Sequence, residues 1–425
     1  MQPPEDSADQ HSYRRLLMVL LGTATFFEGY DSGITAIVLR DLAREFDINT
    51  LDTTRLTGPI VVMGFGAFGA MFVTMLGDRI GRRPLMIITT FAYALFTGLT
   101  ATSQSLGAFM TYQFFARAFL IAEFATAITI VAEEFPADRR GRALGTLTAL
   151  GAFGLPLAAV VHLMSAGTSL GWRTVYIVGL IPLMVVGVLR TKLRETARWQ
   201  AARASGDHLK RVRFRTVLDG EHRRTLLTVS ALYFFAHFAL LGASTWWPLF
   251  VRAHRGFSAS AVTALLLSAF PLGVAGFLAA GRLQDRIGRR PTGTIFLVLG
   301  LAFGLATFQV RSLALMFPVL AMAVFFGFGV SPVLGAIVTE SFPTDIRATS
   351  VAFARSIFGT LGATLGPFTV GILADRQLAA RVPGWPVLGN LGACVSVAIL
   401  MYIPAMFILR RLPETAGAEL EAIAN

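Results

Sequence analysis

The stretch DRIGRRP at residues 78–84 recurs unchanged at residues 285–291, 207 residues later. A second match has the same offset. Five residues of the stretch 133–140 recur in the stretch 340–347: Glu133, Phe135, Pro136, Asp138 and Arg140 correspond to Glu340, Phe342, Pro343, Asp345 and Arg347. Two separate matches at one offset indicate an internal duplication. The chain is therefore predicted to consist of two homologous halves, related by an axis along a membrane normal.

The composition indicates a protein that faces lipid. Of the 425 residues, 54% are hydrophobic and only 15% are charged, whereas a soluble domain is about 25% charged. A net charge of +12 would suggest nucleic acid in a soluble protein, but here Lys and Arg lie between apolar runs, so we expect no nucleic-acid partner. Cys394 is the only cysteine, which excludes an internal disulfide and a cysteine-clustered metal site, and no cofactor is expected.

Twelve apolar runs are long enough to cross a bilayer, which takes about 20 residues. Lipid offers no partner for unpaired backbone groups, so each run is predicted to be a helix. The runs are residues 15–39, 57–76, 85–103, 108–132, 143–165, 172–189, 224–249, 258–280, 292–310, 313–339, 348–373 and 387–409. The predicted fold class is an all-α membrane protein in which twelve transmembrane helices form two homologous six-helix bundles. The predicted divisions are a tail 1–14, a half 15–189, a linker 190–223, a half 224–409 and a tail 410–425.

The distribution of Lys and Arg predicts the orientation of the chain. With the N-terminus inside, 26 of these residues fall on the inner side and nine on the outer side. The excess of positive charge marks the cytoplasmic side, so we expect a multi-pass protein of the plasma or bacterial inner membrane with both termini in the cytoplasm. Trp residues then fall at or near the outer boundary, namely Trp172, Trp246, Trp247 and Trp385. A monomer is expected to suffice for function.

These motifs resemble those of the major facilitator superfamily. The repeated loop is similar to the family signature G-x-x-x-D-R-x-G-R-R, which the second copy fits from Gly281 onward, while the first copy has Thr74 in place of the leading Gly. The stretch 413–421 resembles the closing P-E-T-x-G-x-x-L-E of sugar porters and organic-acid symporters, and 194–199 is similar to their P-E-S-P-R-W. The resemblance implies the major facilitator fold, secondary transport and alternating access by two rocking halves.

Residues 28–31, EGYD, resemble the D-G-F/Y-D motif of the aromatic acid:H+ symporters. Span 4 departs from that branch because its Gly-rich stretch is absent. Glu28 and Asp31 lie three residues apart and so share one helical face. Ionisable groups within spans are costly and are by default functional. We therefore predict proton coupling at Glu28, Asp31 and Glu123, with ion pairing to a neighbouring Arg as the structural alternative.

Two arginines within predicted spans are candidates for substrate binding. Arg117 and Arg355 carry permanent charges and each can hold a carboxylate through two hydrogen bonds. Tyr30 and His237 complete the predicted binding set. The alternatives are a structural salt bridge of Arg117 with Glu28, Asp31 or Glu123, snorkelling of Arg355, and a hydrogen-bonded interior role for His237.

The repeated loop is predicted to form a cytoplasmic gate. Its carboxylates can cap a helix N-terminus or pair with an Arg of the other half. Such contacts would hold the inner side closed and break as the halves move; otherwise the arginines serve only to orient the chain. The predicted gate residues are Asp78, Arg79, Arg82, Arg83, Asp285, Arg286, Arg289 and Arg290.

Together these features predict a secondary transporter that couples protons to the symport of a small organic anion, with an aromatic carboxylate as one candidate. The expected partners are the substrate, H+ and the lipid bilayer. The alternatives are a sugar-porter-like carrier, proton-driven drug efflux, favoured by Gly151, Gly154 and Pro156 in span 5, and a membrane receptor or intramembrane enzyme. The motifs H-E-x-x-H and G-x-x-x-x-G-K-[ST] are absent from the sequence, so no enzyme is predicted.

Overall fold

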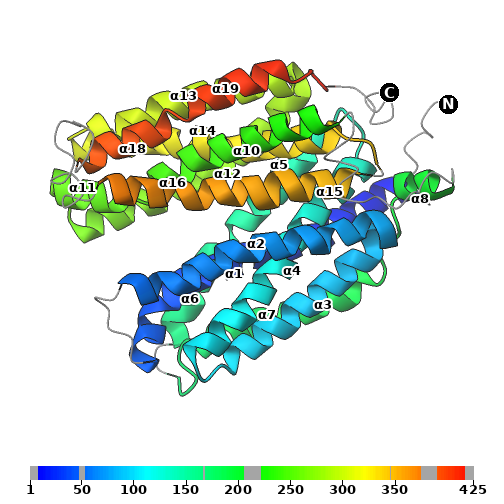
Figure 1. Ribbon diagram of the computed structural model, residues 1–425, viewed down its shortest axis with the longest axis horizontal. Helices are drawn as coiled ribbons and strands as arrows, with labels where there is room; N and C mark the ends of the chain where they lie inside the picture. The colour runs from blue at the N-terminus through cyan, green and yellow to red at the C-terminus, as the bar shows by residue number, and fades with distance from the viewer. Residues whose placement is uncertain are drawn as a thin grey trace. The chain divides into compact units, whose positions relative to one another are not determined.

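The computed structural model describes residues 8–46, 53–165, 168–204, 222–344, 346–374 and 390–416, and every regular element within them is a helix (Figure 1). The chain divides into two compact units. Unit 1 comprises residues 1–136, 146–214 and 343–352, and unit 2 comprises residues 137–145, 215–342 and 353–425. Each unit thus includes one short segment from the other repeat.

Unit 1 is built around α4, which packs against both α2 and α3, while α7 packs on α3 and α6 packs on α1. Aromatic side chains from three of these helices meet in its core, among them Tyr30, Phe109 and Tyr176. Its helices are α1 (Ala8–Glu45), α2 (Thr53–Ile80), α3 (Arg82–Ala101), α4 (Leu106–Glu134), α6 (Gly154–Ser165), α7 (Arg173–Arg190), α8 (Ala197–Ala204) and α15 (Arg347–Val351). The helix α5 (Arg140–Ala152) begins in unit 2 and ends in unit 1.

Unit 2 repeats this arrangement around α14, which packs against α12 and α13, while α10 packs on α16 and α19. Its helices are α10 (Arg223–Ser244), α11 (Trp247–Arg255), α12 (Ala259–Ile287), α13 (Arg289–Gln309), α14 (Leu313–Glu340), the π-helix η2 (Ala352–Gly359), α16 (Thr360–Leu373), α18 (Leu391–Ile399) and α19 (Tyr402–Arg411). In Figure 1 these helices run from green to red.

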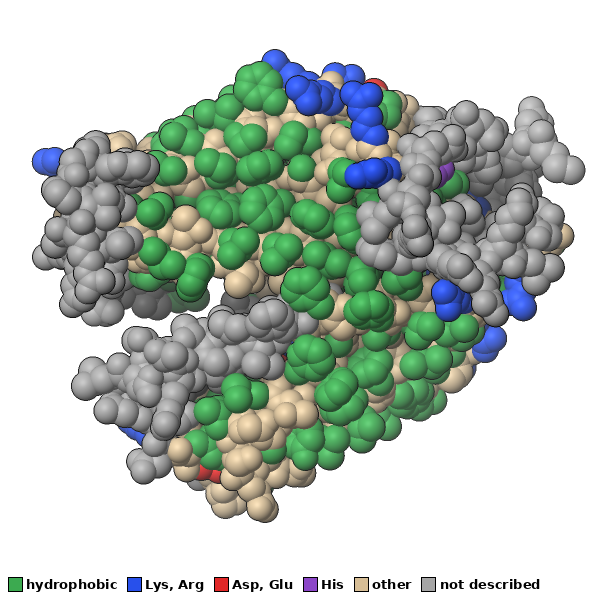
Figure 2. Space-filling model, viewed as in Figure 1, with side chains coloured by type: hydrophobic (Ala, Val, Ile, Leu, Met, Phe, Trp, Pro, Cys, Tyr) green, Lys and Arg blue, Asp and Glu red, His purple; other side chains and the backbone are tan. Residues whose placement is uncertain are grey.

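The helix surfaces are apolar, as lipid requires. Figure 2 shows hydrophobic side chains over most of the described surface in view, with Lys and Arg toward the helix ends. Large exposed side chains include Phe72, Leu95 and Ile181, each at least 59% exposed. Within the described residues, ten helical segments are long and apolar enough to cross a membrane. The long helices α1 and α2 precede them, and the predicted all-α membrane fold is confirmed.

Three predicted spans are interrupted where the prediction had continuous helices. The span 143–165 divides into α5 and α6, 224–249 into α10 and α11, and 387–409 into α18 and α19. In each case a Pro lies in the first turn of the second helix: Pro156, Pro248 and Pro404. Pro has no N–H to give to the preceding turn, so it is tolerated at a helix start and breaks a helix interior.

The predicted span 348–373 is also irregular, because it runs through α15, η2 and α16. Arg355 lies in the π-helical turn, a form that is rare and frequent at functional sites. The predicted surface helix around Trp199 is present as α8. Residues 1–7, 205–221 and 417–425 of the predicted tails and linker, and Trp385, lie outside the described residues.

Candidate functional site

The repeated heptapeptide forms the tight turn between α2 and α3 and, in unit 2, the turn between α12 and α13. Gly81 and Gly288 have φ angles of 105° and 104°, in a region that Gly adopts readily and other residues avoid. The next residues, Arg82 and Arg289, are each only 1% exposed. The turn therefore sends one arginine of each heptapeptide into the interior.

Glu133, at the end of α4, is the centre of a buried ion cluster in unit 1. Its Oε1 accepts hydrogen bonds from Arg82 at 3.0 Å and from Arg347 at 3.1 Å, while its Oε2 accepts one from the Thr196 hydroxyl at 2.6 Å. Arg82 also donates to the Thr344 carbonyl at 2.8 Å. A buried charge without its partner is strongly destabilising, so this cluster, which we call the Glu133 cluster, needs all its members.

Unit 2 contains the same cluster around Glu340. Arg289 donates to both carboxylate oxygens at 3.0 and 2.8 Å, and Arg140 donates to Oε1 at 2.9 Å. The Thr415 hydroxyl donates to Oε2. Glu340, Arg289 and Arg140 take the positions that Glu133, Arg82 and Arg347 have in unit 1, so this Glu340 cluster is a second copy of the first. In each cluster, the second arginine comes from the other repeat.

The acidic residue of each heptapeptide caps a helix. Asp78 accepts hydrogen bonds from the Thr349 backbone N–H at 2.8 Å and hydroxyl at 2.6 Å, at the start of α15. Asp285 accepts from the backbone N–H groups of Gly141 at 2.9 Å and Arg142 at 2.7 Å, at the start of α5. A carboxylate at a helix N-terminus is stabilised by the unsatisfied N–H groups and the helix dipole. Whether these caps open during transport stays a prediction.

The stretches 194–199 and 413–417 occupy matching places in the two repeats. Glu195 accepts from the backbone N–H of Arg82 at 3.0 Å, and Glu414 accepts from that of Arg289 at 2.8 Å. Both glutamates thus cap the helix that follows the heptapeptide.

The other arginines of the predicted gate are more exposed than Arg82 and Arg289. Arg83 and Arg290 each donate to a backbone carbonyl at 2.7 Å, of Thr191 and Arg410 respectively. Arg79 and Arg286 are exposed. The buried part of the predicted gate is therefore Asp78, Arg82, Asp285 and Arg289.

Asp31 in α1 is 1% exposed within unit 1. The Arg117 guanidinium and the Tyr93 hydroxyl face its carboxyl group, and Arg117 donates to the Asp31 backbone carbonyl at 3.4 Å. Neither carboxylate oxygen completes a hydrogen bond with a described residue. Asp31, Tyr93 and Thr97 line a space too narrow for a water molecule. A buried carboxyl group with unsatisfied oxygens is suited to hold a proton.

Glu123 in α4 pairs with an arginine that the sequence prediction did not consider. Its Oε1 accepts from Arg190 Nη1 at 2.6 Å, and the same nitrogen donates to the Thr90 hydroxyl at 2.5 Å. Hydropathy placed Arg190 in the linker, but it is the last residue of α7 and fully buried. The structural alternative foreseen for Glu123, ion pairing, is therefore present, with Arg190 rather than Arg117 as the partner.

The other two predicted residues of the EGYD motif lie on the same helix as Asp31. Tyr30 is buried, and its hydroxyl donates to the Val175 carbonyl at 2.8 Å, which ties α1 to α7. Glu28 is half-buried. The structure thus gives Tyr30 a packing role and sets Asp31 apart as the most enclosed acid of the motif.

Unit 2 brings His237 and Arg355 together. The His237 ring stacks on Tyr233 with centroids 5.6 Å apart, and its Nδ1 lies 3.0 Å from the Tyr233 carbonyl oxygen. Arg355 is close enough to both rings to interact electrostatically. This group combines a basic side chain with two aromatic rings.

Several residues of these clusters were not predicted as functional. The members missed are Glu133, Arg140, Arg190, Glu195, Thr196, Glu340, Arg347, Glu414 and Thr415. The signal for four of them was available, because Glu133, Arg140, Glu340 and Arg347 belong to the second repeated match. An ionisable residue that recurs at the offset of a duplication is a candidate for a buried pair.

Comparison with known proteins identifies the family to which the chain belongs. Residues 21–367 match the family model described as Major Facilitator Superfamily. The cis,cis-muconate transport protein of Acinetobacter baylyi is 28% identical over 91% of this chain and 92% of its own length. The 3-(3-hydroxy-phenyl)propionate transporter of Escherichia coli is 28% identical over 92% and 94%. The proton:xylose symporter XylE superposes with a TM-score of 0.79 at 17% identity, covering 97% of this chain and 99% of that one.

Proposed function

Because the chain belongs to the Major Facilitator Superfamily, which makes it a transporter and not an enzyme, we propose that it carries a small organic anion across the membrane together with a proton. The observation that carries the proposal is the buried Asp31 carboxyl group, whose oxygens have no hydrogen-bond partner among the described residues, facing the permanent charge of Arg117. Asp31 is the proton carrier and Arg117 binds the carboxylate of the substrate.

The coupling follows from competition for one arginine. A guanidinium keeps its charge in proteins, so an ionised Asp31 is compensated by Arg117 while the substrate is absent. A substrate carboxylate that binds Arg117 through two hydrogen bonds removes that compensation. An uncompensated buried carboxylate is strongly unfavourable, so Asp31 then takes up a proton. Substrate and proton enter together without a long-range signal.

The relatives support the substrate class. The names of the two relatives above state muconate and 3-(3-hydroxy-phenyl)propionate, both of which are carboxylates. An organic acid is therefore a better candidate for this chain than a neutral sugar. Arg355 and His237 are proposed to assist in binding, since they add a second cation beside aromatic rings. Alternating access would require the Asp78 and Asp285 caps to open and close.

The test is binding by the purified protein, measured by thermal shift against benzoate, cis,cis-muconate and xylose. We expect the two carboxylates to stabilise the wild type and xylose to have no effect. Arg117→Lys should weaken carboxylate binding, because an ammonium lacks the two-pronged geometry, and Arg117→Ala should weaken it at least tenfold. Arg311→Ala, which removes an exposed arginine, is the matched control. Saturable xylose binding that survives Arg117→Ala, without any response to carboxylates, would contradict the proposal.

A further inference from the structure

Unit 1 shows how this scaffold binds a carboxylate at a helix corner. The place where α1 ends and α7 begins, which we call corner 1, consists of Glu45, Ser103, Trp172 and Arg173. Arg173 donates to the two oxygens of Glu45 at 2.6 and 2.8 Å and to the Ser103 carbonyl at 2.7 Å. The Trp172 indole N–H donates to Glu45 at 2.6 Å. The Arg173 guanidinium also lies 4.5 Å above the Trp172 ring.

Unit 2 has an equivalent corner, where α11 and α13 end and α18 begins. Its arginine, Arg255, donates to the Phe308 carbonyl at 2.5 Å, much as Arg173 donates to that of Ser103. The guanidinium lies 4.9 Å from the centre of the Phe250 ring. We call this arrangement, with Asn390 at the start of α18, corner 2.

The two corners differ in the acid. In the part of the chain that the structure describes, no carboxylate pairs with Arg255, and its buried Nε has no hydrogen-bond partner. The repeat does not supply one either, because the residue 207 positions after Glu45 is Arg252. Arg255 is therefore held against a backbone carbonyl and an aromatic ring much as Arg173 is, although it comes from the end of α11 and Arg173 from the start of α7, and among the described residues it has no acidic partner.

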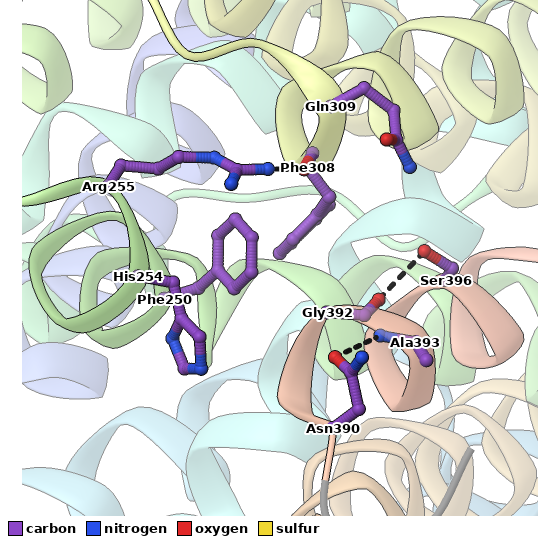
Figure 3. A pocket seen from close by; sticks show the side chains of 9 residues that line it. All are labelled: Phe250, His254, Arg255, Phe308, Gln309, Asn390, Gly392, Ala393 and Ser396. Atoms are coloured by element: carbon purple, nitrogen blue, oxygen red, sulfur yellow. Dashed lines mark hydrogen bonds between the residues drawn. The ribbon is translucent and has the colours of Figure 1, made fainter. Parts of the chain in front are cut away.

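A cavity of about 400 Å³ occupies corner 2. Figure 3 shows the Arg255 side chain reaching past the Phe250 ring toward Phe308, with Asn390 and Ser396 across the opening. The Phe250 and Phe308 rings lie 4.9 Å apart between centroids. Pockets for small molecules typically have volumes of about 300–1,000 Å³ and apolar walls with a few polar groups. Corner 2 has the size, two aromatic walls, one cation and several hydrogen-bonding side chains.

We propose that corner 2 is a binding site for a small aromatic carboxylate, in which the ligand supplies the anion that Glu45 supplies in corner 1. Arg255 binds the carboxylate, and the Phe250 and Phe308 rings contact the aromatic ring of the ligand. The site lies wholly within unit 2 and uses neither Asp31 nor Arg117, so it is independent of the proposed transport site. By the predicted topology it faces the outside, where it would hold an arriving or regulatory ligand.

The test is 19F NMR line broadening of 4-fluorobenzoate by the purified full-length protein, with neutral 4-fluorobenzamide as the ligand control. The measurement is made in the Arg117→Ala variant, so that binding at the proposed transport site does not contribute. We expect saturable broadening of the benzoate and none of the benzamide. Arg255→Gln, which keeps a donor for the Phe308 carbonyl and removes the charge, should weaken binding at least tenfold. Arg311→Ala removes an exposed arginine that follows α13 and should leave binding unchanged.

The outcomes separate this inference from the proposed function. Undiminished broadening in Arg117→Ala/Arg255→Gln would overturn corner 2 as the site, and so would the absence of any broadening in Arg117→Ala, which would mean that Arg255 is satisfied within the chain. Neither result bears on carboxylate binding at Arg117, which is tested by comparing the wild type with Arg117→Ala. Thermal unfolding of each variant shows that a loss of binding is not a loss of fold.

Discussion

The two repeats are alike where the DRIGRRP turns lie and unlike within the spans. The Glu133 and Glu340 clusters use equivalent residues with nearly equal distances. The interior acids and bases of unit 1 have no such counterparts: the residues 207 positions after Asp31, Arg117 and Glu123 are Phe238, Val324 and Val330. The duplicated clusters therefore serve a structural task common to both units, whereas the proposed chemistry of coupling lies in unit 1 alone.

The largest effect is expected at Asp31, because the comparison assigns coupling to a residue that has no acidic counterpart in unit 2. Asp31→Asn should reduce substrate accumulation against a gradient more than tenfold while exchange persists, since an amide cannot carry the proton. Uptake into proteoliposomes with an imposed pH gradient measures this. Glu45→Gln removes another carboxylate from α1, at its exposed end, and should leave accumulation near the wild-type level. Accumulation by Asp31→Asn with unchanged pH dependence would move the proton site elsewhere, first to Glu123.

The likeness of the clusters predicts matched losses of stability. Glu133→Gln and Glu340→Gln each leave two buried arginines without their shared carboxylate, which costs about 3–5 kcal/mol for a broken buried pair. Denaturation in detergent should give nearly equal shifts for the two variants. Asp138→Asn, at a largely exposed ion pair, should shift little. A large difference between the two variants would show that the clusters are not equivalent.

The Glu123–Arg190 pair can be tested by apolar replacement, because unit 2 has Val330 at the position equivalent to Glu123. Glu123→Val or Arg190→Leu alone leaves one buried charge and should cost about 3–5 kcal/mol, whereas an apolar replacement of both residues is often neutral. We expect the double variant to be more stable than either single variant, as measured by thermal unfolding. If the loss of stability in the double variant equals the sum of the losses in the two single variants, the pair has a role beyond neutralising its own two charges.

The helix caps should have a smaller effect on stability and a measurable effect on rate. Asp78→Asn and Asp285→Asn keep a hydrogen-bond acceptor but lose the charge at the N-termini of α15 and α5. Loss of a cap costs about 1 kcal/mol, so both variants should fold. Transport should slow severalfold in each, measured as the initial rate of exchange. Wild-type rates in both variants would reduce Asp78 and Asp285 to structural caps.

The smallest effect is expected at corner 1 and depends on pH. Hydrogen bonds from Arg173 lower the pKa of the Glu45 carboxyl group, which lies beyond the predicted span 15–39. Its contribution to stability is present above the ordinary pKa of Glu and is lost as the pH falls through the lowered value. The melting temperature of the wild type should exceed that of Glu45→Gln at pH 7, and the difference should shrink as the pH falls through the lowered pKa of Glu45 and vanish below it. A difference independent of pH would exclude the charge as its source.

Sequence alone predicted the features that repeat or that depend on local spacing. The offset of 207 residues predicted two homologous halves, the apolar runs predicted helices, and the glycines of the heptapeptide fit the turns at Gly81 and Gly288. Hydropathy could not locate the interruptions at Pro156, Pro248 and Pro404, because an apolar window looks the same whether Pro begins a helix or lies within one.

The partners of interior charges could not be predicted in the same way. Glu123 meets Arg190 across 67 residues of sequence, at a span end that hydropathy assigned to the linker. The approach of Tyr93 to Asp31 depends on how α1 and α3 both pack against α4 and α7, which no local pattern records. Corner 2 could not be predicted either, because the cavity beside Arg255 is formed by three helix ends that are far apart in the sequence.

The segments exchanged between the repeats constrain how the chain is completed during synthesis. Unit 1 ends with residues 343–352, which are translated after residues 215–342 of unit 2. Until they emerge from the ribosome, Glu133 lacks Arg347 and Asp78 lacks the helix start that it caps. Residues 137–145 are translated early, but their hydrogen bonds with Arg289 and Asp285 can form only after those residues have been translated. Neither repeat can therefore mature first as a finished domain, and a chain cut in the linker would yield two fragments that complete each other only in the same membrane.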